Sequence, residues 1–195
     1  MTDSEKSTAA ADAITILSRW DAPSSHITLR DEYLTFLRER GSSALDRAGG
    51  PAHLTASCFI FTPDLGHVLL CFHRKGQFWV QVGGHIDAAD DDLVEAALRE
   101  AREESGLNGL TVADGVLDLD RHHLGAAFGR CQTHWDVGFV ALSPLLSPQV
   151  SDESEQVAWF PVDALPERMA KSVKARIVVM LRQLVAPSVP LTSDT

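Results

Sequence analysis

Three glutamates and an arginine within two helical turns are the residues best suited to chemistry in this sequence. They lie in the segment Gly83–Leu107, where Glu100, Glu103 and Glu104 fall at i, i+3 and i+4 and therefore share one side of a helix. Arg99 precedes Glu103 by four positions, which lets its guanidinium hold that carboxylate. Because three carboxylates within one turn repel each other, the pattern favours a bound cation. Oxygen ligands suit Mg²⁺ or Mn²⁺ better than zinc.

The same cluster has a simpler explanation, which is a solvated charged face with glutamate–arginine pairs. The glycine pair Gly83 and Gly84 favours the metal site, because glycines let backbone carbonyls approach a metal or a phosphate closely. An apolar stripe over Val94–Ala101 is expected to pack against a sheet, with the glutamates on its flank.

The segment resembles the Nudix box, whose pattern is G-x5-E-x7-R-E-U-x-E-E-x-G-U, with U a bulky apolar residue. Positions 99–107 read REAREESGL and match the second half, with a small residue at the first U position. Gly84 matches the first glycine with one inserted residue, since it stands fifteen positions before Arg99 and the family has fourteen. Asp90 or Asp91 then stands where the family has its first glutamate, and the sequence leaves open which.

The resemblance implies an α/β fold, a Nudix-type α/β/α sandwich with a mixed β-sheet. It also implies a Mg²⁺-dependent hydrolase, with Mn²⁺ as an option, that cleaves the diphosphate linkage of a nucleoside diphosphate derivative or related metabolite by metal-activated water. By the same resemblance Glu100, Glu103 and Glu104 are metal ligands, and the Gly84 carbonyl completes the metal shell. Glu103 and Glu100 are then catalytic, one of the glutamates acting as or aligning the general base, and Arg99 orients them.

Two rival functions share this fold. A catalytically silent, Nudix-like nucleotide-binding sensor would be expected to lose the acids of the box, whereas this chain keeps them. An isopentenyl-diphosphate isomerase would need an active-site cysteine and glutamate. Neither Cys58 nor Cys71 has a recognisable motif around it, and both lie in apolar, strand-like runs typical of a buried core.

Residues outside the box are weaker candidates for substrate contact. Arg74 and Lys75 precede Trp79, so that a basic side chain could bind phosphate while the aromatic ring stacks on a base; a charged turn explains them equally well. Glu153 or Glu155 could add one more carboxylate, as Nudix enzymes often recruit one from such a late loop, with a solvated loop as the default.

Two histidines on neighbouring strand candidates form a separate pattern. If the strands pair, His122 and His134 could meet and bind a second metal or a substrate phosphate. Ordinary surface or hydrogen-bonded histidines are the favoured explanation.

Hydrophobic periodicity predicts the elements that must position these residues. Strands are expected over 54–61, 67–72, 78–82 (ended by the glycine pair), 112–119, 133–142 and 157–160, and helices over 93–104 and 173–185. The chain is expected to divide into an N-terminal helical extension over 1–50, a Nudix hydrolase domain over 51–187 and a flexible tail over 188–195. The extension could cap the sheet or form an oligomer contact.

Composition narrows the class of protein further. The 195 residues carry a formal net charge of −10, which argues against a general nucleic-acid binder. No stretch approaches the roughly 20 apolar residues needed to cross a bilayer. The three widely spaced cysteines fit a reducing compartment. We therefore expect a cytoplasmic protein with a small-molecule diphosphate substrate, no nucleic-acid polymer or membrane as partner, and a homodimer as one option.

Overall fold

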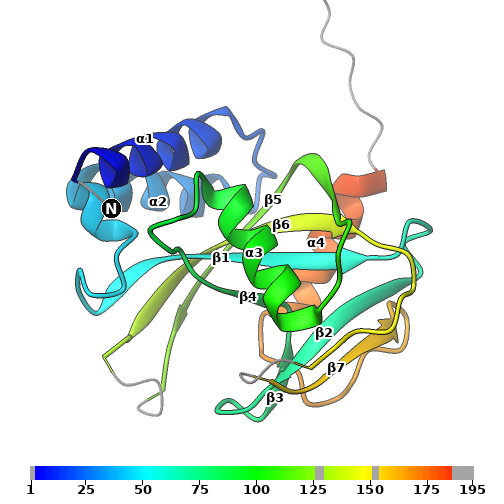
Figure 1. Ribbon diagram of the computed structural model, residues 1–195. Coiled ribbons are helices and arrows are strands. Elements are labelled where there is room, and N and C mark those ends of the chain that lie inside the picture. Colours follow the sequence, from blue (N-terminus) through cyan, green and yellow to red (C-terminus); the bar gives the residue numbers. More distant parts are fainter. Residues whose placement is uncertain (1–2, 126–129, 151–153, 186–195) are drawn as a thin grey trace, which may run out of the picture.

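A mixed β-sheet with helices on both faces organises the computed structural model, which describes residues 3–125, 130–150 and 154–185 (Figure 1). In the described chain the sheet has seven strands in the order β3-β2-β1-β6-β5, with β4 paired to β1 and β7 to β2. The strands are β1 (Ala52–Phe61), β2 (His67–His73), β3 (Phe78–Val80), β4 (Val82–His85), β5 (Thr111–His123), β6 (Thr133–Leu142) and β7 (Ser154–Pro161). The helices are α1 (Asp3–Arg19), α2 (Ile27–Arg40), the 3₁₀ helix η1 (Gly41–Ala44), α3 (Leu93–Ser105) and α4 (Val173–Val185). The α/β class and the mixed sheet are confirmed.

Strand β1 is the centre of the sheet, because it pairs in parallel with β6 and antiparallel with β2 and β4. Its side chains alternate between the two faces, as the period of a strand requires. Leu54, Ala56 and Cys58 belong to the core beneath α3, whereas Phe59 and Phe61 belong to the core beneath α4. The strand therefore carries both cores, and it is buried over nearly its whole length.

Helix α3 packs through small residues. Ala96, Ala97 and Ala101 are fully buried, as is Leu93, so the helix backbone can approach the sheet closely. The expected apolar face over Val94–Ala101 is thus rotated slightly, since Val94 itself is only half-buried. On the opposite face α4 contributes three buried side chains: Val173, Ile177 and Met180. In Figure 1, α3 lies in front of the sheet and α4 behind it.

The segment expected as one strand over 78–82 is divided into two strands, and the glycine pair does not end it. β3 pairs with β2, whereas β4 pairs with β1, so the chain crosses from one strand to the other at Gln81. Gly83 and Gly84 lie within β4, opposite Ser57 and Ala56. A Cβ on Gly83 would lie 2.4 Å from the Ser57 Cα, and the φ of Gly83 is 146°, so this position needs glycine.

The N-terminal extension covers the sheet beside α3. Phe36 of α2 stacks on Trp135 of β6 with ring centroids 4.5 Å apart, and Tyr33 meets the same indole edge-on at 4.9 Å. The Tyr33 hydroxyl donates a hydrogen bond to the Asp136 carbonyl at 2.9 Å. Of the two roles left open by the sequence, covering the sheet is the one seen within this chain. The tail over 188–195 lies outside the described residues.

No helix in the described part of the chain is both long enough and apolar enough to cross a membrane.

The Phe36–Trp135 stack is expected to contribute measurably to stability. Phe36→Ala removes a half-buried ring and its aromatic contact, and should lower the free energy of unfolding by about 2 kcal/mol. Urea denaturation followed by circular dichroism measures this change. The neighbouring Thr35→Ala is the control, because Thr35 is exposed and its loss should cost no more than about 0.5 kcal/mol. Equal stability of the two variants would contradict the packing of α2 on β6.

Candidate active site

Helix α3 has well-defined ends that fix the position of its acidic residues. The Asp92 side chain accepts a hydrogen bond from the Glu95 amide at 2.8 Å and caps the N-terminus. At the other end Gly106 adopts a left-handed conformation with φ 68°, and its amide donates to the Arg102 carbonyl. The thirteen residues between these caps form the helix that holds the candidate site.

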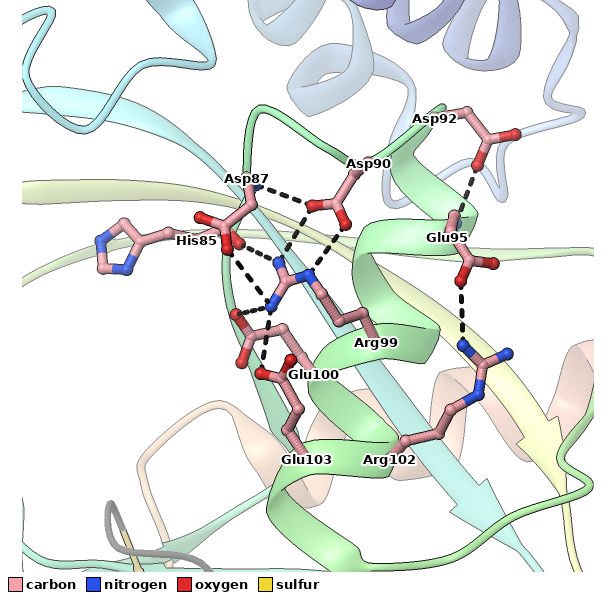
Figure 2. Close-up of polar contacts among 9 residues, drawn as sticks. All are labelled: His85, Asp87, Asp90, Asp92, Glu95, Arg99, Glu100, Arg102 and Glu103. Atoms are coloured by element: carbon pink, nitrogen blue, oxygen red, sulfur yellow. Dashed lines mark hydrogen bonds and ion pairs between the residues drawn. The ribbon is translucent and has the colours of Figure 1, made fainter. Parts of the chain in front are cut away.

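Arg99 is the centre of the polar network on this helix (Figure 2). Its guanidinium donates to both carboxylate oxygens of Asp90, at 2.8 and 2.9 Å, and to the His85 carbonyl at 2.9 Å. The Nη1 group donates to Glu100 at 3.0 Å and to Glu103 at 3.2 Å. The hydrogen bond with Asp90 raises the pKa of Arg99. Arg99 therefore holds two of the predicted site carboxylates, as the i, i+4 spacing and the resemblance led us to expect.

Asp90 holds the acidic loop, which is one residue longer than the family pattern, against helix α3. Its carboxylate is almost fully buried, binds Arg99 in a bidentate manner and also accepts the Asp87 amide hydrogen at 2.7 Å. Asp91, by contrast, is exposed. The sequence left open which of the two aspartates takes the position of the first acid of the box. Asp90 is the one that is buried against Arg99. The inserted residue is absorbed in the loop, and α3 stays regular.

The two glycines of β4 bring the strand directly against the glutamates. A Cβ on Gly84 would lie 2.7 Å from the Glu100 carboxylate carbon, so a side chain at this position would force the carboxylate to move. The Gly83 amide donates to Glu104 at 2.8 Å. Glu104 is buried, whereas the Glu103 side chain is 60% exposed. The structure thus brings Gly84, Arg99, Glu100 and Glu103 together, and Glu104 lies against the adjacent Gly83.

A cavity of about 570 Å³ begins at these glycines and extends over the α4 face of the sheet. Its walls include Phe78 and Val80 of β3, His122 of β5 and Lys171 before α4. At its floor, Thr55 and Ser57 of β1 lie beside acidic residues of β5 and β6. The space is large enough for a nucleotide-sized ligand, and Gly83 and Gly84 are the residues that it shares with the glutamate site.

The floor of this cavity holds a buried ion-pair network that sequence reasoning missed. Arg176 of α4 is only 4% exposed and pairs with Asp118 and with Asp136, the latter at 2.7 Å. Although burial opposes the charge, these carboxylates raise the pKa of Arg176. Thr55 and Ser57 donate to Asp136 at 2.9 and 2.6 Å. The available signal was an arginine at a core-facing position of an otherwise apolar helical stripe.

The weaker substrate candidates that the structure describes belong to the β2–β3 turn, to β3 and to β7. Arg74 and Lys75 are exposed at the β2–β3 turn, where Arg74 donates to the Ser154 carbonyl. Trp79 packs against Phe160 and other residues of the core under α4, and does not line the cavity. Glu155 accepts a hydrogen bond from the Gln77 side chain at 2.9 Å. Glu153 lies outside the described residues.

The predicted pairing of the two histidine-bearing strands is observed. His122 faces His134 across β5 and β6, with ring centroids 5.5 Å apart. The His122 Nδ1 is 2.8 Å from Asp120, so this histidine has an ordinary hydrogen-bond partner.

Comparison with known proteins identifies the family. The NUDIX domain family matches residues 51–181, two thirds of the chain, and the protein therefore belongs to the Nudix family. None of the curated proteins matches the sequence.

Solved structures share the fold at low sequence identity. An Ap4A hydrolase of C. elegans, solved as a binary complex, superposes with a TM-score of 0.57 at 17% identity, covering 67% of this chain and 96% of the other. A NUDIX family hydrolase from Clostridium perfringens gives 0.55 at 23% identity, covering 68% and 97%. The NUDIX domain of Shewanella oneidensis NrtR, solved with ADP ribose, gives 0.52 at 21% identity, covering 67% and 87%.

The Arg99–Asp90 pair predicts that substitutions of two neighbouring aspartates change the free energy of unfolding by different amounts. Asp90→Asn removes the charge that Arg99 faces and should lower the free energy of unfolding by about 1–3 kcal/mol. Asp91→Asn is the matched control and should change it by less than about 0.5 kcal/mol, because Asp91 is exposed. Chemical denaturation of both variants checks this. A larger loss in the Asp91 variant would show that the loop uses the other acid.

Proposed function

We propose that this protein is a divalent-metal-dependent pyrophosphohydrolase that cleaves the diphosphate linkage of a nucleoside diphosphate derivative or a related metabolite. The chain belongs to a family of pyrophosphohydrolases. The observation that carries the proposal is the close approach of Gly84 to the Glu100 carboxylate, where a Cβ would lie 2.7 Å from the carboxylate carbon and would force it to move. The similar structures are named for Ap4A hydrolysis and for bound ADP ribose, which supports a nucleotide-derived substrate.

The donor set fits Mg²⁺, with Mn²⁺ as an alternative. Glu100, Glu103 and Glu104 offer only carboxylate oxygens, and the absence of a Cβ on Gly84 leaves its backbone beside Glu100. These four residues would hold the metal. When bound, it would neutralise the phosphate charge and activate water for attack on phosphorus.

The chain's own residues prepare the site for this reaction. Arg99 fixes the carboxylates of Glu100 and Glu103 in one orientation, since it donates to both from a single nitrogen. Glu103 is the exposed member and is our candidate for accepting a proton from the attacking water. Glu104 is held against β4 by the Gly83 amide. The helix, strand and acidic loop thereby orient the carboxylates before substrate arrives.

The cavity next to Gly84 would receive the moiety attached to the diphosphate. Phe78 supplies a ring for stacking, and His122 and Lys171 supply hydrogen-bond donors or charge. Arg74 and Lys75 at the β2–β3 turn and Glu155 on β7 remain predicted substrate contacts, as does Glu153, which lies outside the described residues. Trp79 belongs instead to the core under α4, so we assign it no substrate contact.

The rival functions find less support. Cys58 and Cys71 are fully buried, and burial raises the pKa of Cys58 to about 12, so neither thiol suits the acid–base role of an isomerase. Turnover of a substrate distinguishes an enzyme from a catalytically silent sensor. A cytoplasmic location agrees with three cysteines that form no disulfide among the described residues, and it stays a prediction, as does a homodimer.

Turnover and its loss in one variant test the proposal. Purified protein with Mg²⁺ and a panel of nucleoside diphosphate derivatives should release phosphate-containing products, detected by chromatography. Glu103→Gln keeps the shape of the side chain but removes the negative charge, and should lower kcat by about 10²–10⁴-fold with the fold intact.

Glu95→Gln is the matched control on the same helix. Glu95 pairs with Arg102 at 2.9 Å on a side of α3 away from Glu100 and Glu103, so its loss should leave kcat nearly unchanged (Figure 2). Full activity of the Glu103 variant would refute the assignment. Binding of a substrate without turnover by the wild-type protein would favour the sensor.

Gly84→Ala should affect activity more than stability. The added methyl group would displace the Glu100 carboxylate, which is the end of a flexible side chain, so the free energy of unfolding should fall by only about 1 kcal/mol. Loss of carboxylate alignment should lower kcat by at least about tenfold. Steady-state kinetics and denaturation on the same sample compare the two effects, and unchanged kinetics would contradict the role given to this glycine.

A further inference from the structure

Three histidines and a cysteine meet at one end of the sheet, apart from the glutamates. Each of His53, His85, Cys131 and His134 offers one ligand atom, and these atoms all lie within 4.8 Å of one another. The register of the strands explains the meeting. His53 of β1 pairs with His134 of β6, while His85 of β4 pairs with Thr55, which lies two residues from His53 on the same face. Cys131 joins them from the segment that leads into β6.

Two histidines of this cluster have buried ring nitrogens without the partners that buried polar groups normally have. The His53 residue has 0% exposure, and within the described chain neither of its ring nitrogens forms a hydrogen bond of ordinary geometry, although the Gly50 backbone interacts with the ring; nor does the His134 Nε2. Leaving such atoms unpaired costs about 1–3 kcal/mol each. Ring centroids are 5.0 Å apart for His53 and His85 and also for His53 and His134, so the rings face one another.

The protonation state of the cluster suits metal binding. Burial lowers the pKa of His134 to about 3, and it also lowers the pKa of His53. Both imidazoles are therefore neutral near pH 7, which is the form that binds metals.

We propose that His53, His85, Cys131 and His134 form a binding site for one transition-metal ion, with Zn²⁺ as the preferred occupant. Nitrogen and sulfur ligands favour zinc over Mg²⁺, and four protein ligands make a closed, structural site. Tetrahedral zinc places its ligand atoms about 3.3–3.6 Å apart. The observed upper limit of 4.8 Å is within about 1.5 Å of that spacing.

Charges of both signs surround the histidine–cysteine cluster. The positive charge of Arg47 contributes to the lowered pKa of all three histidines, and so opposes a cation. Three acidic residues, Asp46, Asp87 and Asp90, line the same small cavity as Arg47 and His85. The Cys131 thiol, 3.9 Å from the His85 Nε2, would bind as a thiolate and supply a further negative charge.

A metal at this position would stabilise the strand that carries the candidate active site. It would connect the start of β1, the end of β4 and the entry to β6. The His85 carbonyl accepts the Arg99 guanidinium, and the adjacent residue is Gly84. The zinc site would therefore have a structural role. Its proposal does not depend on the proposed hydrolase function.

Metal content and Co²⁺ spectroscopy test the proposal directly. Untagged full-length protein should retain about one zinc per chain after dialysis, measured by mass spectrometry of the metal. Replacement with Co²⁺ should give the visible absorption of a tetrahedral ion together with a thiolate charge-transfer band. Cys131→Ala should abolish that band and weaken zinc binding beyond the 10–100-fold typical of changes outside the ligand shell.

His123→Gln is the matched control. His123 is exposed nearby, bonds to Thr133 and lies outside the cluster, so this variant should keep the zinc and the cobalt spectrum. Should Cys131→Ala fold poorly, the wild-type protein still decides the question, because zinc must raise its Tm and a zinc-selective chelator must lower it. Folded wild-type protein that binds neither zinc nor Co²⁺, or a Cys131 variant with an unchanged cobalt spectrum, would overturn the proposal.

Discussion

The arrangement of the acidic segment depends on the hydrogen bonds and ion pairs formed by the Arg99 guanidinium. Eight acidic residues and two arginines lie between positions 85 and 104, and Arg99 alone binds Asp90, Glu100, Glu103 and the His85 carbonyl. The Asp90 carboxylate is only 2% exposed, so its attraction to Arg99 is weakly screened and fixes the loop against the helix. One positive charge does not balance this many carboxylates. The same contact that orders the site therefore leaves an excess of negative charge for a divalent cation to neutralise.

The parts of the molecule that follow local rules could be predicted from the sequence. The helix over Leu93–Ser105 has its own caps and periodicity, and Arg99 reaches Glu103 because i, i+4 neighbours meet on any helix. The identity of the aspartate that holds Arg99 could not be predicted. Asp90 and Asp91 are chemically equal and adjacent, and only the path of the loop decides which one is buried.

Features that depend on tertiary contacts were harder to infer. Arg176 stands on the core-facing side of an amphipathic helix, where a charge is unexpected, and it is buried because three aspartates of β5 and β6 lie beneath it. The pairing of β4 with β1 was missed for a similar reason, since a Gly-Gly pair normally ends a strand. Here the glycines are required by close approach, Gly83 to Ser57 and Gly84 to Glu100.

The short strand β4 joins the two candidate metal centres. Gly84 adjoins the oxygen donors of α3, whereas His85, the next residue, adjoins the nitrogen donors of β1 and β6 and the sulfur donor of the segment before β6. Hard oxygen ligands favour Mg²⁺, and imidazole with thiolate favours zinc, so the two sets select different ions despite their proximity. Because side chains alternate along a strand, successive residues of β4 can serve opposite faces of the sheet. The position of one strand thus governs both the approach to the glutamates and the closure of the histidine cluster.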